Sequence, residues 1–336
     1  MKLFFRIVLV YAAVSLGVIV VLRYPSPALA SQAMAATRTF GLQFTAAAIY
    51  MMPLLLLVPF VLGWRRFVSQ LGLVGYAVMG SVTLQVAFSF LKSAIPMIVP
   101  FYADRALADA DRWLHGGADP WELAHRWTEG LPVDALMPVY LSVWTIPAVA
   151  LALVIAVSDR DAERTARFVL LYLSCWIVLG NLFALAGSSV GPVFYDALIG
   201  GDRFAGLHRA LAESGLSNGA VGGIQSYLWT SYTDRSMALA SGISAFPSVH
   251  VSIATLTAIY MAERSRWLLL PGLIFVATIQ FLSVYTGYHY ALDGYFSMLF
   301  VVGFWAVLRR IRLTGAEGAV ARFAQVPDAP LAIRRG

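Results

Sequence analysis

Near the end of the chain, two long apolar runs are joined by the stretch Tyr285-Thr286-Gly287-Tyr288-His289-Tyr290-Ala291-Leu292-Asp293. His289 and Asp293 share one face if the segment is helical, because residues four apart on a helix are neighbours. The carboxylate can then accept a hydrogen bond from one ring nitrogen and leave the other nitrogen free as a nucleophile or base. Ionisable residues at the end of an apolar run are costly, which points to function. The pair could also be only an interfacial hydrogen bond, and these residues alone favour neither interpretation.

The composition is that of a membrane protein. Of the 336 residues, 60% are apolar and 12% are charged, whereas soluble domains carry about 25% charged residues. Eight apolar runs approach the length of a membrane span, near 4–22, 42–62, 71–91, 136–157, 167–187, 246–262, 267–285 and 290–308. The sequence therefore predicts an all-α, polytopic membrane bundle of about eight transmembrane helices, with further helices in the interface. The single cysteine, Cys175, lies inside an apolar run, which excludes an intrachain disulfide.

The short loops sort by charge when alternate loops are assigned to opposite sides. One side takes Lys2, Arg6, Arg65, Arg66, Arg160, Arg164, Arg167, Arg264, Arg266, Arg309, Arg310 and Arg312. By the positive-inside rule, this side and both termini are cytoplasmic. The net charge of +6 therefore reports orientation, and we expect no nucleic-acid partner.

His250 begins the sixth run and His289 the eighth, so two crossings bring both histidines to one depth at the outer interface, where we place an active site.

We divide the chain into three parts. Residues 1–70 form N-terminal transmembrane helices, 71–310 a membrane core, and 311–336 a disordered basic cytoplasmic tail. The first part starts like a signal peptide, but its apolar run is long and more spans follow; we expect an uncleaved helix, with cleavage after Ala30 as the alternative.

Two long outer loops interrupt the core. Loop 93–135 contains an amphipathic stretch, with Leu107 and Trp113 on one side and Asp104 and Asp111 mostly on the other. It continues into Asp119-Pro120-Trp121-Glu122, a pattern typical of a helix start. We expect one or two helices lying in the interface, as a cover over a lipid groove or as a passive anchor. Loop 188–245 leads directly into His250, and we interpret it as a cover over the active site.

A second motif precedes His250. The segment reads Gly242-Ile243-Ser244-Ala245-Phe246-Pro247-Ser248-Val249-His250. Proline and serine just before a helix favour a helix N-terminus, whose free N–H groups can hold phosphate. The Ser248 hydroxyl can add a donor, and His250 in the first turn could protonate a departing alkoxide.

These motifs resemble those of a known family. Pro247-Ser248-Val249-His250, followed by His289 and Asp293, resembles the second and third motifs of the type-2 phosphatidic acid phosphatase superfamily. The fuller segments 245–250 and 285–290 more closely resemble its inositol phosphorylceramide synthase branch, with the similarity covering roughly 185–308. The resemblance implies a six-helix phosphatase-like core in which His289 attacks phosphorus to give a phosphohistidine. It implies that Asp293 orients His289, that His250 acts as acid and then base, and that no metal or other cofactor takes part.

The sequence departs from the phosphatase members at several positions. Val249 stands where they have glycine, and Ser283 stands where they have an arginine six residues before the nucleophile. By topology the counterpart of their first motif is Gly191-Pro192, with Ala184 in place of its lysine. A second partial fit is Lys92 with Pro100, which has Val99 in place of the arginine and lies two spans too early, although on the correct side. Other groups must then hold the phosphate, and we predict that Ser248, Lys92, Gly191 and Pro192 bind it. The candidate cations are Lys92, Arg203, Arg209 and Arg235.

These features predict an integral membrane lipid phosphotransferase that moves an inositol-phosphate-like headgroup between lipid alcohols. A lipid or isoprenyl phosphate phosphatase with the same site is the alternative, and a catalytically silent scaffold or transporter is a third. The partners would be membrane lipids, and the location a bacterial inner membrane with the site facing the periplasm; the sequence names no protein partner. We expect Tyr288 and Tyr290 to be interfacial aromatics and Asn181 to make an interhelical hydrogen bond. Solvated loop positions are expected for His115, His125 and His208.

Overall fold

The computed structural model describes residues 1–24 and 28–311. Over these residues the chain is all-helical and contains no β-strand. Seven helical segments are long and apolar enough to cross a membrane: Lys2–Arg23, Leu29–Leu62, Leu71–Ile98, Val133–Ser158, Ala162–Ala186, Arg266–Tyr285 and Ala291–Arg310. The prediction of a polytopic, all-α membrane protein is confirmed. The predicted tail lies, from residue 312 onward, outside the described residues.

The predicted span near 246–262 is a helix too short to count among these seven. It forms α13 (Val249–Arg264), a helix of 16 residues that measures about 24 Å at 1.5 Å per residue, less than the ~30 Å of a hydrocarbon core. The helix begins late because Ser248 caps it, its hydroxyl oxygen accepting the Val251 N–H. The count of full-length spans among the described residues is therefore seven, with α13 packed beside α14 (Leu269–Tyr285) and α15 (Ala291–Arg309).

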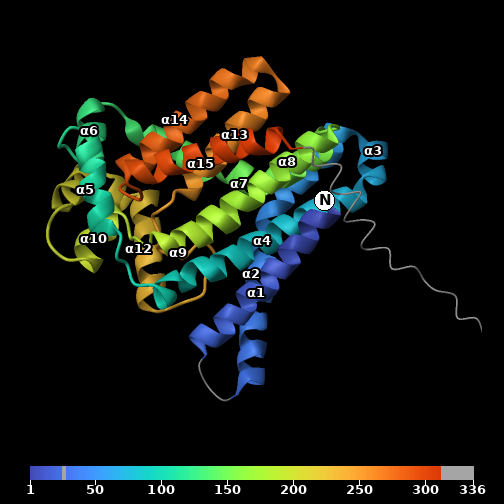
Figure 1. Ribbon diagram of the computed structural model, residues 1–336, viewed down its shortest axis with the longest axis horizontal. Coiled ribbons are helices and arrows are strands. Elements are labelled where there is room, and N and C mark those ends of the chain that lie inside the picture. The colour runs from blue at the N-terminus through green and yellow to red at the C-terminus, as the bar shows by residue number, and fades with distance from the viewer. Residues whose placement is uncertain (25–27, 312–336) are drawn as a thin grey trace, which may run out of the picture.

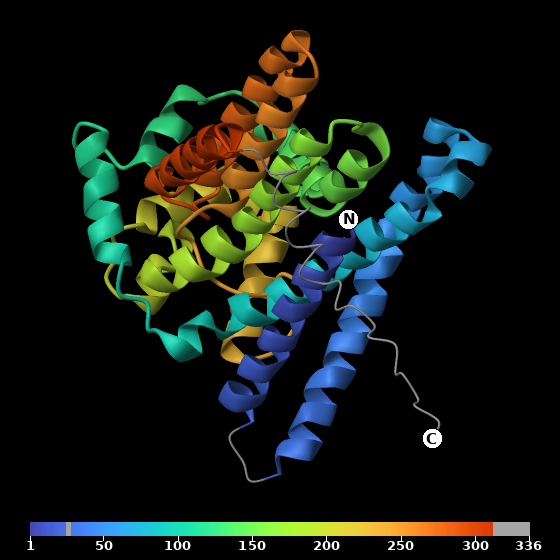
Figure 2. The ribbon, with the colours of Figure 1, turned by 45° about the vertical axis from the view of Figure 1, so that its right-hand side comes forward.

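The N-terminal helices form a hairpin against the rest of the bundle. Helices α1 (Lys2–Arg23) and α2 (Leu29–Leu62) run side by side, and their connected ends extend away from the other helices (Figures 1 and 2). α1 packs closely on α4 (Leu71–Ile98), where a side chain at Gly80 would meet the Phe4 ring at 2.4 Å. The short helix α3 (Trp64–Ser69) connects α2 to α4.

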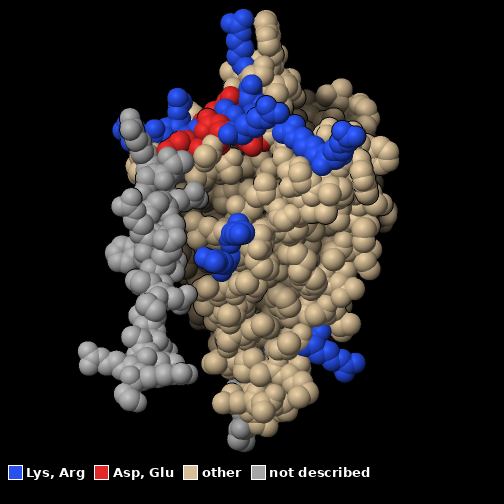
Figure 3. All heavy atoms as spheres, turned by 90° about the vertical axis from the view of Figure 1, so that its right-hand side faces the viewer, with Lys and Arg blue, Asp and Glu red and all other residues tan. Residues whose placement is uncertain are grey.

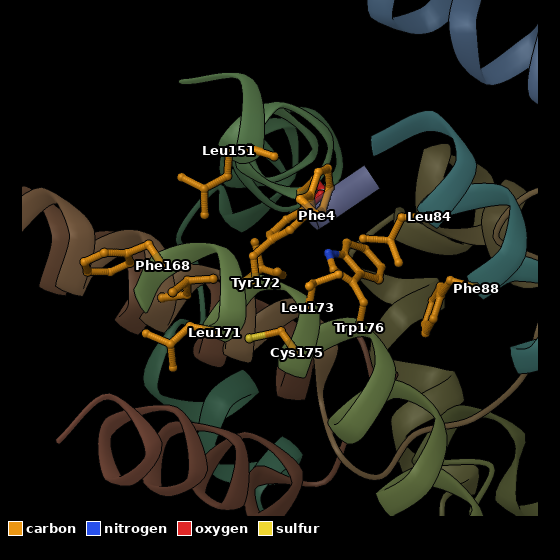
Figure 4. Close-up of a cluster of buried hydrophobic side chains, with 14 of the residues drawn as sticks. Phe4, Leu84, Phe88, Leu151, Phe168, Leu171, Tyr172, Leu173, Cys175 and Trp176 are labelled. Carbon is orange, nitrogen blue, oxygen red and sulfur yellow. The ribbon is translucent and has the colours of Figure 1, made fainter. Parts of the chain in front are cut away.

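A buried apolar cluster joins α1 and α4 to the middle of the chain. It includes Phe88 of α4, Tyr172 of α8 (Ala162–Leu173) and Trp176 of the π-helical segment η3 (Ser174–Phe183), together with residues of α7 (Thr145–Ser158) (Figure 4). Close packing of such side chains is the main source of stability in a helical bundle. Within the same region the Tyr11 hydroxyl donates to Asn181, which confirms the expected interhelical hydrogen bond.

Short helices gather at one end of the bundle (Figure 1). They are α5 (Asp104–Leu114), α6 (Pro120–Trp127), α10 (Pro192–Leu198), α11 (Ala205–Glu213) and α12 (Ala220–Thr233). α6 begins at Pro120 after Asp119, as the sequence predicted. Helix α6 packs against α14, and α5 packs against α15, so the two helices lie over the segments that carry the candidate site.

The remaining connections are short: α9 (Ala184–Ala186) and the turns η1 (Val133–Leu136), η2 (Val139–Val143), η4 (Leu216–Asn218) and η5 (Arg266–Leu268). Figure 3 views the end of the bundle where α3 and α8 lie in Figure 1. Lys and Arg side chains form a band across this end, with acidic side chains among them. At the start of α8, an ion pair joins Arg164 Nε to Asp159 at 2.6 Å.

Candidate active site

His289 and Asp293 lie together where α14 turns into α15. The Nδ1 atom of His289 is 3.3 Å from Oδ2 of Asp293, and the Asp293 side chain is fully buried. The same carboxylate oxygen accepts the backbone N–H of Tyr290 at 3.0 Å, within the first turn of α15. With Nδ1–H donating to the carboxylate, the lone pair of Nε2 is left available, which is the arrangement of an oriented nucleophile or base.

His250 lies in the first turn of α13, as predicted, and aromatic rings fix its orientation. Its ring stacks on Trp144 at a centroid distance of 3.9 Å and on Tyr140 at 4.8 Å. The Trp144 indole N–H also donates to the His250 carbonyl at 2.9 Å. The ring centroids of His250 and His289 are 5.9 Å apart. The three residues predicted to be catalytic are therefore neighbours.

Both histidines line a cavity of about 640 Å³, and Lys92 of α4 lines it with them. The remaining lining is mainly apolar and includes Trp144 and Trp176. Among the described lining residues, Lys92 is the one Lys or Arg. Arg203 is bound instead to Asp109 and Asp119 outside the cavity. Of the four candidate cations, only Lys92 faces both histidines.

The cavity environment keeps His289 neutral. Burial, and next the positive charge of Lys92, lower the pKa of His289 to about 3, while a hydrogen bond with the Ala245 backbone raises it in part. A neutral imidazole carries the lone pair that attack on phosphorus requires. The geometry and the pKa therefore both suit a nucleophile at neutral pH.

Ser248, Gly191 and Pro192 lie near this site but do not line the cavity. The Ser248 hydroxyl oxygen is engaged by Val251 N–H, and Pro192 is the buried first residue of α10. Gly191 adopts φ +84°, and a Cβ there would lie 2.6 Å from the Tyr288 carbonyl oxygen, so glycine is required. Their role in binding phosphate stays a prediction.

Two aspartates of α5 support the site in a way the sequence reasoning missed. The Asp104 carboxylate accepts the N–H groups of Val190 and Gly191 and the Tyr290 hydroxyl. The Asp111 carboxylate accepts the N–H groups of Ala291 and Leu292 at 2.9 and 3.1 Å. The N–H groups that they accept lie at the starts of α10 and α15, where backbone N–H groups have no intrahelical partner. Burial raises the pKa of Asp111 to about 6 despite these hydrogen bonds.

The face of α5 that carries Asp104, Ala108 and Asp111 is thus turned inward. Asp104 and Asp111 are 1% and 2% exposed, whereas Trp113 is 79% exposed. The seven-residue spacing of the two aspartates, which places them on one face of a helix, was the available signal. The sequence predicted an amphipathic helix but not that its carboxylates would cap α10 and α15.

Several residues expected at the surface are tied to the site. Tyr290 is buried and hydrogen-bonds to Asp104. The His125 ring stacks on Tyr285 at 3.8 Å and bonds its carbonyl, and His115 bonds the Tyr295 hydroxyl. The prediction that His115 and His125 are simply solvated is wrong, because α5 and α6 pack over the site; His208 is exposed as predicted.

Fold and site together define a polytopic membrane protein with two histidines, an aspartate and a lysine gathered at a largely apolar cavity. The model of the PAP2 superfamily matches residues 105–307, well over half of the chain, and the chain belongs to this superfamily. No curated protein and no solved structure matches the chain. Membership implies a phosphatase-type enzyme that acts on lipid phosphates. The match includes both histidine motifs and leaves out α1, α2 and Lys92.

Proposed function

We propose that this protein is a lipid phosphotransferase that moves a phosphate-linked headgroup, of the inositol-phosphate type, between lipid alcohols. The observation that carries the proposal is the convergence of His289, His250 and Lys92 on one apolar cavity. An apolar cavity suits the hydrocarbon part of a lipid, and the three polar groups suit its phosphate.

The first half of the reaction forms a covalent intermediate. The Nε2 lone pair of His289 attacks phosphorus, and the new N–P bond replaces the P–O bond to the departing lipid alcohol. Burial, and next the charges of His289 and Lys92, lower the pKa of His250, and the negative charge of a bound phosphate acts in the opposite direction. With substrate bound, the protonated His250 gives its proton to the oxygen that leaves. Asp293 holds Nδ1–H of His289 and stabilises the positive charge that develops on the ring. Lys92 offsets negative charge on the phosphoryl oxygens.

The second half reverses the roles. His250, now neutral, takes the proton of the acceptor hydroxyl as that oxygen attacks phosphorus and the N–P bond breaks. An alcohol acceptor gives a new phospholipid, and water gives free phosphate or a phosphorylated headgroup. The apolar lining beside His250 favours a lipid alcohol over bulk water, and the resemblance to the inositol phosphorylceramide synthase branch points the same way. Hydrolysis by the same residues is the second candidate, and membership of the superfamily favours it.

Purified full-length protein in detergent tests the proposal with phosphatidylinositol or phosphatidic acid as donor and ceramide or diacylglycerol as acceptor. Mass spectrometry follows new phospholipid, and a colorimetric assay follows free phosphate. Wild type is compared with His289→Ala, His250→Ala and the exposed control His208→Ala. New phospholipid that requires His289 and His250 supports the transferase, and free phosphate alone supports the phosphatase. Turnover that survives His289→Ala contradicts both.

A further inference from the structure

A second cavity lies behind the catalytic one and is polar. It measures about 470 Å³ and is lined by Arg23, Arg235 and several hydroxyl-bearing side chains, among them Ser93 and Ser236. None of the described lining residues is acidic. The hydroxyls of Ser93, Ser236 and Ser241 donate to backbone carbonyls, so the two arginines supply the donors for a ligand. Two guanidinium groups without a carboxylate form a surface that favours an anion.

Arg23 is held in place by its own hydrogen bonds. Its Nη2 donates to the carbonyl and to the hydroxyl of Ser93, both at 3.0 Å, and its Nη1 donates to the Arg235 carbonyl. Its Nε–H is buried and has no acceptor among the described residues. The guanidinium is thus pre-positioned at the cavity wall with donor capacity remaining, since arginine carries five N–H donors.

Arg235 occupies a backbone position that normally takes glycine. It follows α12 with φ +49°, and the Ser236 N–H bonds the Ser231 carbonyl while the Arg235 N–H bonds the Tyr232 carbonyl. This is the Schellman pattern of a helix end, in which the left-handed residue is usually glycine. Arginine here costs backbone energy, and its exposed side chain lines the cavity.

The two cavities share a wall. Gly242 and Ile243 line both of them, and the adjacent residues Lys92 and Ser93 of α4 line the first and the second respectively. The wall is thin because a Cβ at Gly242 would lie 2.7 Å from Lys92 atoms. An anion in the second cavity would therefore sit directly behind the lysine of the catalytic cavity.

We propose that the cavity between Arg23 and Arg235 is a second phosphate-binding site, separate from the one at His289. Its ligand is a phosphate group, carried either by free phosphate or by the headgroup of an anionic lipid. The site stands on its own residues and does not require the proposed phosphotransfer.

Binding of inorganic phosphate to full-length protein in detergent, measured by titration calorimetry, tests the site. All variants are made in the Lys92→Met protein, because this substitution removes the cation of the catalytic cavity. Arg235→Gln is expected to weaken phosphate binding by about tenfold, since one charge-assisted interaction is lost. Arg38→Gln, an exposed arginine of α2, is the matched control and should bind as the Lys92→Met protein does. Arg235→Gln is the informative variant because the Arg235 carbonyl still accepts from Arg23.

A second arm separates the two sources of phosphate. The same proteins are placed in nanodiscs of phosphatidylcholine alone or with phosphatidic acid, and retained lipid is quantified. Phosphate binding that depends on Arg235 identifies free phosphate as a ligand, and Arg235-dependent retention of phosphatidic acid identifies a headgroup. Either result supports the site. Absence of both, or binding unchanged by Arg235→Gln and by Arg23→Gln, overturns it, whatever the outcome for catalysis at His289.

Discussion

The Nδ1 atom of His289 lies 3.3 Å from Oδ2 of Asp293, and the backbone N–H of Tyr290 donates to that same oxygen at 3.0 Å. Asp293 therefore orients the histidine and also fixes the first turn of α15. Asparagine at 293 can still accept the Tyr290 N–H but cannot stabilise a positive imidazole. We predict that Asp293→Asn lowers kcat by roughly 10²–10⁴-fold with little change in the thermal unfolding midpoint. Near-normal turnover in a folded Asp293→Asn protein would contradict the orienting role.

We predict that Lys92 binds the substrate phosphate, and its charge also lowers the pKa of His289. After burial, its charge is the main influence that lowers this pKa to about 3. Without that charge the pKa rises toward its ordinary value of about 6.5. The nucleophile must be neutral, so activity is lost as pH falls through the pKa, and Lys92→Met moves this acid limb to higher pH.

The measurement is kcat/KM against pH for Lys92→Met, with Lys92→Arg as the variant that keeps the charge. We also expect Lys92→Met to lose about 10²-fold or more in kcat/KM, because charge on the phosphoryl oxygens is no longer offset. An acid limb at the same pH in both variants would show that Lys92 does not act on His289.

Gly242, which lines both cavities, allows the 241–243 segment to pack directly on α4. An added methyl group would lie 2.7 Å from the Lys92 carbonyl carbon and Cγ, so either α4 or the 241–243 segment must shift. We predict that Gly242→Ala lowers kcat/KM at least about tenfold, since small displacements of a catalytic group are costly. Gly223→Ala in α12, where nothing lies within 4 Å of the added carbon, is the control and should leave activity unchanged. Equal activity of the two variants would contradict this account of the wall.

Asp111 links α5 to the start of α15. Its removal leaves the N–H groups of Ala291 and Leu292 without their acceptor, at a cost of about 1–3 kcal/mol. We predict that Asp111→Ala lowers both the free energy of unfolding and kcat, because α15 carries Asp293. Asp109 of the same helix, whose side chain is 73% exposed, is the control, and its replacement by alanine should cost less than about 1 kcal/mol. The measurements are denaturation curves and turnover numbers for both variants, and equal losses in the two would contradict the role of Asp111.

The sequence predicted the helical class, the start of α6 at Pro120, and the meeting of His250 with His289 and Asp293. The catalytic roles of these three residues stay predictions. The structural predictions depend on local patterns: apolar run length, a proline after an acidic cap, and a four-residue spacing. It also predicted that Lys92 reaches the phosphate, and the structure places this lysine beside both histidines. The predicted start of α13 was three residues too early, because Phe246 and Pro247 extend the apolar run ahead of the Ser248 cap.

The rest depends on contacts between distant segments. The hydrogen bonds from Ala291 to Asp111 and from Tyr290 to Asp104 join residues 180 and 186 positions apart, which no local pattern encodes. Stacking of His250 on Trp144 likewise requires η2 and α7 to pack on α13. Two like-signed arginines, Arg23 and Arg235, meet only because α1 ends beside the end of α12.

A covalent phosphoryl group on His289 is the central claim, and a trapping experiment tests it most directly. Wild-type protein turning over labelled phosphatidic acid is quenched in alkali, which preserves phosphohistidine, and the peptides are sequenced by mass spectrometry. We predict acid-labile phosphate on the peptide that contains His289, absent in His289→Ala and present in His208→Ala. Turnover without any label on His289, or label on His250 instead, would contradict the account.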